Sequence, residues 1–350
     1  MLTLLLIYKY KIMKNFNYFI GIDVSKETLD FCCYNNGKKT IETKINNQQK
    51  SIRAYLKKLI ADKLIDIDTS IFCMEHTGIY NNHLLKVFLE SNINVWLENP
   101  IHLKRSLGLV RGKNDKVDAE RIAMFAYKNR ESIKLWQPER TVIIKLKHLL
   151  KTRERLLDAI ESIEMPIKEI TSFTDKETVR MFKKSSKASI SGIRKDIKTI
   201  DHMIKETINS DEHVKELFKI ISSVENVGTI ITTAVICYTN EFKKFNSPKK
   251  FACYSGIAPF EHSSGRSIRG KTRTSFMANK FIKKLLHLSA LSAVSRPGEL
   301  RDYFERKVAE GKNKMLVLNA IRNKIILRIF ACVNQNKIFE KNIKNNLILA

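Results

Sequence analysis

Glycine and proline are scarce in this chain, with 12 and 6 among 350 residues. Because both residues interrupt regular elements, their scarcity argues against an all-β fold with many turns and favours long helices. Long apolar runs are also missing. Leu2–Ile7 is too short to cross a bilayer, and no small-residue cleavage site follows it. We therefore expect neither a membrane anchor nor a signal peptide.

The six cysteines form no CxxC pair, and most of them lie in apolar runs. This pattern argues against a zinc site or a disulfide framework and is typical of reduced, buried thiols in a cytosolic protein. The sequence also contains neither a Walker A loop nor a GxGxxG fingerprint, so it lacks the common nucleotide-binding motifs.

Acidic residues are few relative to basic ones: 36 Asp and Glu stand against 63 Lys and Arg, a formal net charge of +27. The excess is concentrated near the C-terminus, where residues 241–350 hold 23 Lys and Arg but only 7 Asp and Glu. Such an excess favours a polyanionic partner, and nucleic acid is the first expectation because released counterions drive phosphate binding. An anionic membrane surface is the alternative, but no basic amphipathic helix with an aromatic face supports it.

Strand-like and helix-like segments alternate between residues 17 and 128. Apolar runs at 18–23, 29–34 and 40–45 predict three strands in a meander, with Asn35-Asn36-Gly37 as a tight turn. Helical spacing follows at 48–64, 82–90 and 118–128, separated by strands at 70–74 and 93–97. The order β-β-β-α-β-α-β-α predicts an α/β domain of the RNase H-like type with a mixed five-stranded sheet.

Residues 139–217 contain almost no glycine or proline and are rich in Lys, Glu, Ile and Leu. This composition predicts long helices in a hairpin that breaks near residues 166–174. A coiled-coil arm for dimerisation and a plain helical bundle are both compatible with it, because the heptad pattern is not clean. A mostly helical unit is predicted from Ile220 onward, where Val224–Gly228 is the turn of a helix–turn–helix pair that can touch phosphates. Its later helices are expected at 278–295, 298–310 and 314–333.

These patterns divide the chain into five parts. They are a non-core extension (1–16), an RNase H-like metal-binding domain (17–135), a helical or coiled-coil arm (136–219), a mostly α-helical C-terminal domain (220–335) and a basic tail (336–350).

Four carboxylates are candidates for chemistry in the first domain. Asp23 ends the first predicted strand and Glu75 the fourth, whereas Asp115 and Asp118 share one face at the start of a helix. Strands one and four are neighbours in an RNase H-like sheet, so the acids should gather at one edge. Gathered acids repel unless a cation lies among them. Mg²⁺ fits, because it binds few carboxylates and leaves positions for phosphate oxygens, and two such ions can act on one scissile phosphate.

Each of these acids also has a structural interpretation. Asp23 can cap the turn that follows it, Glu75 can pair with a lysine, and Asp115 with Asp118 resembles a helix cap. The set favours a metal site, because three separate elements deliver acids to one sheet edge.

A segment rich in serine, glycine and arginine, Glu261–Gly270, is predicted to be a loop. A serine in it can attack phosphorus if cations neutralise the phosphate and a base or a metal takes the proton. Gly265 lets the backbone approach DNA. The basic side chains that can bind phosphate oxygens are Arg266, Arg269, Lys271 and Arg273. A flexible phosphate contact without a catalytic role is the other interpretation.

Four blocks of the sequence resemble a known family. Gly21–Lys26 (GIDVSK), Glu75–Tyr80 (EHTGIY) and Lys113–Ala119 (KNDKVDA) are similar to the three blocks of the DEDD transposases, whose N-terminal domain is RuvC-like. Phe251–Pro259 (FACYSGIAP), followed by Ser263-Ser264-Gly265, resembles their C-terminal transposase block. Bacterial insertion sequences of the "one-ten" type encode these proteins. The resemblance covers about residues 17–333.

This resemblance implies a DNA recombinase that depends on a serine and on metal ions. It assigns Asp23, Glu75, Asp115 and Asp118 to an acidic tetrad that binds Mg²⁺, and Ser264 to the nucleophile that forms a transient covalent link to a DNA end. It also implies donor DNA, target DNA and a structured guide RNA as partners, a homo-oligomer (dimer or tetramer), and a cytoplasmic, nucleoid-associated location in bacteria.

Three other functions stay open from the residues. A metal-only RuvC-like nuclease or junction resolvase uses Ser264 merely as a contact, so a Ser264→Ala variant of it keeps cleavage. An actin-type ATPase is suggested by GIDVSK, but the second glycine-rich phosphate loop is missing. An inactive nucleic-acid-binding relic binds without strand transfer even with Mg²⁺.

Overall fold

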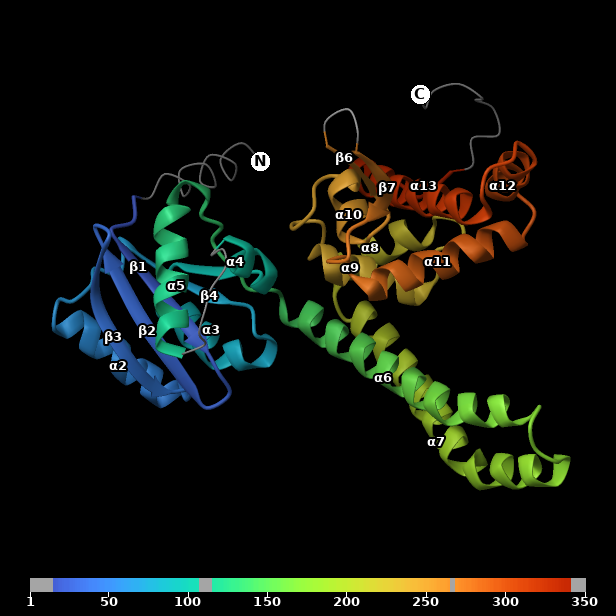
Figure 1. Ribbon diagram of the computed structural model, residues 1–350, viewed down its shortest axis with the longest axis horizontal. Coiled ribbons are helices and arrows are strands. Elements are labelled where there is room, and N and C mark those ends of the chain that lie inside the picture. Colours follow the sequence, from blue (N-terminus) through green and yellow to red (C-terminus); the bar gives the residue numbers. More distant parts are fainter. Residues whose placement is uncertain (1–14, 107–114, 265–267, 341–350) are drawn as a thin grey trace. The chain divides into compact units, whose positions relative to one another are not determined.

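A computed structural model describes residues 15–106, 115–264 and 268–340, and at 115–116 and 261–273 it describes the backbone only. The chain forms two compact units, residues 1–138 and 139–350, which we call the N-terminal and C-terminal units (Figure 1). Each unit is described by itself.

The N-terminal unit is built on a five-stranded mixed sheet in the order β3-β2-β1-β4-β5. Its strands are β1 (Tyr18–Val24), β2 (Thr28–Asn35), β3 (Lys38–Asn46), β4 (Ser70–Glu75) and β5 (Val95–Glu98). β2 runs antiparallel to β1 and β3, whereas β4 is parallel to both β1 and β5. Asn36 and Gly37, both with positive φ, form the predicted turn between β2 and β3. The predicted RNase H-like sheet is thus confirmed.

Helices cover both faces of this sheet (Figure 1). α2 (Gln49–Ala61) and α3 (Asn82–Glu90) pack on one face, together with Ile22 and Met74. α4 (Pro100–Ser106) and α5 (Asp115–Lys128) pack on the other, together with Cys73 and Trp96. Because side chains alternate along a strand, each strand contributes to both cores. We call the two sides the α2/α3 face and the α5 face.

The helix α5 approaches β1 very closely at Gly21. A Cβ atom at this position would lie 2.2 Å from both the carbonyl oxygen of Ala119 and the backbone nitrogen of Ala123. Any side chain other than hydrogen would therefore push the helix away. The contact holds the first turns of α5 over the end of β1, where Asp23 lies.

Two long helices form a hairpin arm in the C-terminal unit (Figure 1). α6 (Thr141–Ile170) and α7 (Lys176–Asn209) are joined by residues 171–175, so the predicted hairpin is confirmed. The break at 171–175 falls at the end of the predicted stretch 166–174, and Pro166 itself lies inside α6. Most buried side chains lie at the base of the arm, such as Leu146, Leu150 and Ile204. Asp175 caps α7 by accepting a hydrogen bond from the backbone N–H of Thr178 (2.8 Å).

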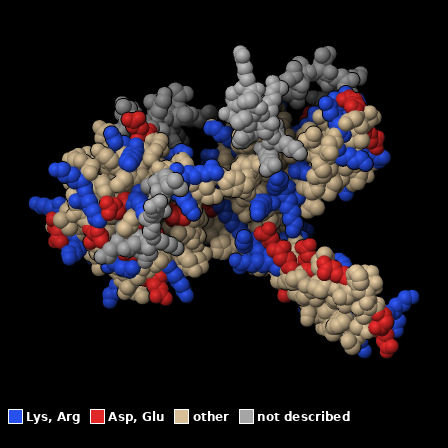
Figure 2. Space-filling view, in the orientation of Figure 1, with Lys and Arg blue, Asp and Glu red and all other residues tan. Residues whose placement is uncertain are grey.

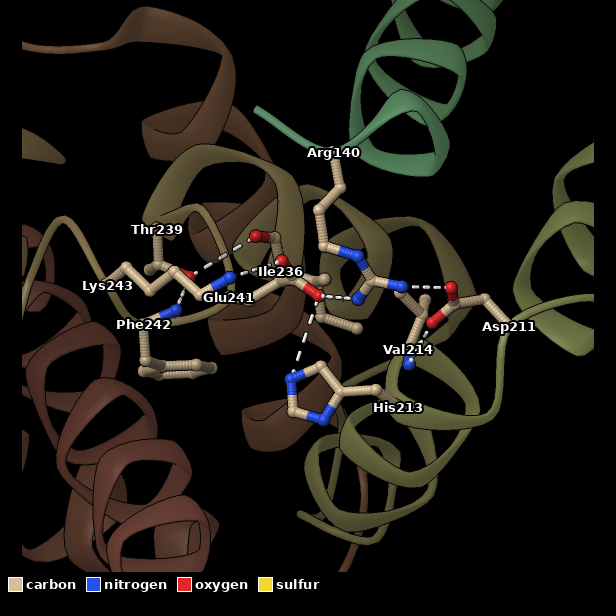
Figure 3. Close-up of polar contacts among 9 residues, drawn as sticks. All are labelled: Arg140, Asp211, His213, Val214, Ile236, Thr239, Glu241, Phe242 and Lys243. Atoms are coloured by element: carbon tan, nitrogen blue, oxygen red, sulfur yellow. Dashed lines mark hydrogen bonds and ion pairs between the residues drawn. The ribbon is translucent and has the colours of Figure 1, made fainter. Parts of the chain in front are cut away.

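An ionic cluster anchors the beginning of α6 (Figure 3). Arg140, directly before this helix, donates to the carboxylates of Asp211 and Glu241. The Glu241 carboxylate is fully buried and also contacts Lys243 Nζ (3.1 Å) and His213 Nε2 (3.6 Å). Asn240, Glu241 and Phe242 all have left-handed backbone angles (φ 48°, 55° and 62°). Arg140 and Lys243 thus pair with a carboxylate that is buried in this left-handed turn.

The remaining helices share one hydrophobic core with the base of the arm. They are α8 (Glu212–Ser222), α9 (Thr229–Thr239), α10 (Pro248–Tyr254), α11 (Lys280–Ser295), α12 (Glu299–Ala309) and α13 (Lys314–Gln335). Buried members of this core include Val235, Phe251, Leu286 and Ile325. A two-stranded hairpin, β6 (Pro259–Ser264) and β7 (Ile268–Thr274), completes the unit. The serine-rich segment was predicted to be a loop, and this was wrong for the residues on either side of 265–267. They pair as strands, although polar residues give them no apolar alternation.

All six cysteines are free thiols, and all except Cys253 are buried. Within residues 15–106, 115–264 and 268–340, no helix is both long and apolar enough to cross a membrane.

Candidate active site

Asp23 and Glu75 occupy neighbouring positions at the ends of two adjacent strands. β1 and β4 pair in parallel with Gly21 opposite Cys73 and Ile22 opposite Met74, so the next position pairs Asp23 with Glu75. Cys73 packs on the α5 face, and Gly21 contacts α5. Because side chains alternate, both acids belong to this same face.

Asp118 joins these two acids from the first turns of α5. Its neighbour Ala119 touches Gly21, two residues before Asp23 in β1. The Oδ1 atom of Asp118 accepts a hydrogen bond from Arg121 (2.7 Å). Burial raises the pKa of Glu75 above its usual value, the negative charge of Asp118 raises this pKa further, and the positive charge of Lys104 lowers it. The structure therefore brings Asp118 into electrostatic range of Glu75.

Asp115 is the first residue of α5, three positions before Asp118. Its side chain lies outside what the structure describes. Among the described side chains, no group of three or more His, Cys, Asp or Glu is assembled closely enough to hold a metal ion. Of the four predicted ligands, Asp23 and Glu75 lie on adjacent strands and Asp118 lies near Glu75 on α5. For Asp115 only the backbone position is described.

The chemistry of this donor set fits a hard divalent cation. Carboxylate oxygens are the side-chain ligands that Mg²⁺ prefers. Two ionised carboxylates on adjacent strands, about 5 Å apart, repel by about 3 kcal/mol at an effective dielectric constant of ~20. The pKa of Glu75 is raised first by burial and then by the negative charge of Asp118. A cation among Asp23, Glu75 and Asp118 would remove the repulsion.

Two further acids at this sheet edge were missed from the sequence. Glu98 in β5 pairs in register with Glu75, and Asp30 in β2 pairs in register with Asp23. Both have partners of their own. Glu98 accepts hydrogen bonds from Trp96 Nε1 (3.1 Å) and from the backbone N–H of Asn99 (2.7 Å). Asp30 is 4% exposed and lies 3.3 Å from Lys44 Nζ. In the sequence, nothing marks these two acids except that each lies in a predicted or neighbouring strand segment, where alternate residues point to the same face.

The candidate nucleophile Ser264 is the last residue of β6 and pairs with Ile268, the first residue of β7. Ser263 pairs with Arg269, and Phe260 pairs with Arg273. Lys271 also lies in β7, whereas Arg266 lies outside the described residues. Positions are described for the backbone of this segment alone. The hairpin belongs to the C-terminal unit and the acids belong to the N-terminal unit.

Basic side chains are spread over the visible surface of both units (Figure 2). Several have no acid within the same helix turn, including Lys280, Lys283 and Lys284 in the first turns of α11. The overall excess of basic side chains favours a polyanionic partner such as nucleic acid.

Two family models match this chain. The family model for DEDD transposases of the IS110 type, described as "Transposase", matches residues 20–169. A second model, "Transposase IS116/IS110/IS902 family", matches residues 218–305. The chain belongs to the IS110 family of transposases. It is therefore an enzyme that recombines DNA.

Relatives of this transposase include a "Pilin gene-inverting protein" from Moraxella lacunata, 29% identical over 330 residues, which are 93% of this chain and 98% of the relative. An insertion element IS116 protein from Streptomyces clavuligerus is 25% identical over 143 residues, 41% of this chain and 35% of the relative. Among solved structures, Thermus thermophilus RuvC in complex with a Holliday junction matches 34% of this chain and 99% of its own, with 12% identity and a TM-score of 0.27. A TM-score this low does not establish a shared fold. The RNase H-like assignment rests on the strand order of the sheet.

Proposed function

We propose that this transposase cuts and rejoins DNA through a serine–phosphodiester intermediate, with Ser264 as the nucleophile and with Mg²⁺ bound by Asp23, Glu75, Asp115 and Asp118. One observation carries the metal half of the proposal: Asp23 and Glu75 are adjacent on parallel strands, with Asp118 in electrostatic range of Glu75. The serine half is supported by the family models, since Ser264 lies in the second matched region.

The proposed chemistry exchanges one phosphodiester for another. The Oγ atom of Ser264 forms a bond to phosphorus, and the bond from phosphorus to one deoxyribose oxygen breaks. The serine proton leaves to a base or to solvent, and the released deoxyribose oxygen takes up a proton. Because the ester bond is conserved in the protein–DNA link, attack by a DNA hydroxyl can reverse the step without a nucleotide cofactor.

The acids and the cations have different roles in this step. Mg²⁺ bound by the tetrad would polarise the scissile phosphate and stabilise the attacking and leaving oxygens. Arg266, Arg269, Lys271 and Arg273 would bind phosphate oxygens and hold the DNA backbone beside Ser264. The proposed nucleophile at the end of β6 and three of its proposed phosphate ligands in β7 would thus lie on one short segment.

The proposed partners are donor DNA, target DNA and an RNA encoded by the element. The net charge of +27 supports polyanionic partners in general. The RNA follows from the family resemblance, and so does a homo-oligomer (dimer or tetramer). Binding of RNA from the non-coding end of the element, measured against a shuffled RNA of equal length, tests the RNA separately from catalysis.

The decisive experiment is a search for a covalent protein–DNA adduct. Full-length transposase is mixed with labelled duplex DNA from an end of its element and with Mg²⁺, and adducts are resolved on a denaturing gel. Wild type and Ser263→Ala should form the adduct, whereas Ser264→Ala, Asp23→Asn and Glu75→Gln should form none. Cleavage that persists in Ser264→Ala without any adduct would refute the serine mechanism and favour a metal-only nuclease.

A further inference from the structure

The hydrogen-bonded register that joins β1 to β4 ends one position before the two acids. Its last partners are Ile22 and Met74. Asp23 stays in register with β2 and Glu75 stays in register with β5, so each acid is held on its outer side. The segments that follow these strands are therefore the next places where β1 and β4 can be tied together.

A buried amide spans these two segments. Asn47 lies between β3 and α2 and is 6% exposed. Its Nδ2 atom donates to the carbonyl oxygen of Ser25 (2.9 Å), two residues after Asp23, and to that of Tyr80 (3.0 Å), in the turn after β4. The Oδ1 atom of Asn47 has no hydrogen-bond partner among the described residues. Because a buried oxygen without a partner is unfavourable for the fold, the two donated bonds are what this amide contributes.

A second buried amide closes the turn after β4 onto Glu75. Asn81 is 1% exposed, and its Nδ2 atom donates to the carbonyl oxygen of Glu75 (3.0 Å). Its Oδ1 atom accepts hydrogen bonds from the backbone N–H of Thr77 (2.7 Å) and from the hydroxyl of the same residue (3.0 Å). Asn81 directly follows Tyr80 in the chain. The path that starts at the Ser25 carbonyl and runs through both amides therefore ends at Glu75.

We propose that Asn47 and Asn81 are positioning residues that hold the backbones of Asp23 and Glu75 at the separation that a divalent ion requires. This inference rests on the proposed function, because it assumes that the two acids bind such an ion. Neither amide binds the ion itself, since both act through main-chain carbonyl groups. Metal–oxygen distances vary by only about 0.2 Å in a working site, so loosening either backbone should lower the affinity for the metal.

The test measures metal binding directly, without DNA. Full-length protein is titrated with Mn²⁺, and free Mn²⁺ is followed by its electron paramagnetic resonance signal. Asn47→Ala and Asn81→Ala should each weaken Mn²⁺ binding by about 10–100-fold, the usual effect of losing a residue that orients metal ligands. Asn94→Ala is the matched control, because Asn94 Nδ2 also donates to a strand carbonyl, that of Ser70 (3.2 Å), at the other end of β4. It should bind Mn²⁺ like wild type.

Thermal unfolding of the metal-free variants separates positioning from stability. All three alanine variants lose an amide that bonds to the backbone, so each should unfold at a lower temperature, but only those at Asn47 and Asn81 should lose Mn²⁺ affinity. If either of these two does not fold, Asn47→Leu or Asn81→Leu fills the same space without the amide and should show the same loss of affinity.

The outcomes distinguish this inference from the proposed function. Wild-type Mn²⁺ affinity in a folded variant at Asn47 or Asn81 would overturn the inference for that residue and leave the proposed function intact. An equal loss of affinity in Asn94→Ala would overturn it for both residues, because the effect would then be general to the sheet. Wild-type protein that binds no Mn²⁺ would overturn the inference together with the metal half of the proposed function.

Discussion

Replacing Gly21 by alanine tests whether the contact between β1 and α5 holds the acids together. The new Cβ atom would lie 2.2 Å from the carbonyl oxygen of Ala119 and 2.2 Å from the backbone nitrogen of Ala123. Carbon atoms require about 3.5 Å from such neighbours, so α5 has to move by roughly 1 Å. Both atoms belong to a helix backbone, so no side-chain rotation can relieve the clash.

This displacement should have two measurable effects. Overpacking of this kind lowers the free energy of unfolding by about 1–3 kcal/mol, and each kcal/mol lowers the unfolding midpoint by roughly 2–4 °C in a unit of this size. Because α5 carries Asp118, a shift of ~1 Å should also lower the rate of Mg²⁺-dependent adduct formation by about 100-fold. Calorimetry and the adduct assay measure the two effects separately.

Gly192→Ala is the matched control for this substitution. Gly192 lies inside α7, and no atom lies within 4 Å of the position that its Cβ atom would occupy. Alanine there should stabilise the helix by about 0.5–1 kcal/mol and leave activity unchanged. A Gly21→Ala protein with wild-type stability and wild-type adduct formation would refute the reasoning, because α5 would then not rest on β1 as described.

Three further predictions concern side chains outside the proposed tetrad. Arg140→Ala leaves the buried Glu241 carboxylate without one of its cations, so the free energy of unfolding should fall by about 1.5–3 kcal/mol in urea titrations. Glu98→Ala removes the acceptor for Trp96 Nε1, and the same measurement should show a loss of about 1–3 kcal/mol. Asp175→Ala removes the N-cap of α7, so amide hydrogen exchange at residues 176–180 should accelerate by about fivefold.

Arg140→Ala and Glu98→Ala each have a control on the same unit. Arg153→Ala breaks an ion pair on the side of the arm, and Glu90→Ala breaks an exposed pair with Arg53, so each should cost at most about 1 kcal/mol. Equal losses for Arg140→Ala and Arg153→Ala would show that the Glu241 cluster is no anchor. Unchanged exchange in Asp175→Ala would show that the cap contributes nothing to α7.

The strand plan was predictable because apolar alternation and turn residues are local signals. Asn36-Gly37 marks a hairpin by chemistry alone, and both Asp23 and Glu75 come where an apolar run stops. The pairing of strands one and four then followed from the general RNase H-like order, not from any local pattern.

What escaped prediction depends on register and on neighbours far apart in the sequence. Asp30 and Glu98 are isolated acids in the sequence, and only the pairing of β2 and β5 with their neighbours aligns them with Asp23 and Glu75. The β6–β7 hairpin was missed because Ser263, Ser264 and their partners form no apolar face.

The alternation of the central strands protects the side of the sheet on which the proposed chemistry would take place. In β4, Phe72 and Met74 pack on the α2/α3 face, whereas Cys73 packs on the α5 face. If β4 slipped by one residue during folding, Glu75 would enter the apolar layer and Met74 would replace it beside Asp23. Such a misaligned chain would lose much of its stability, so quality control that removes unstable proteins would also remove transposase with a misassembled acidic edge.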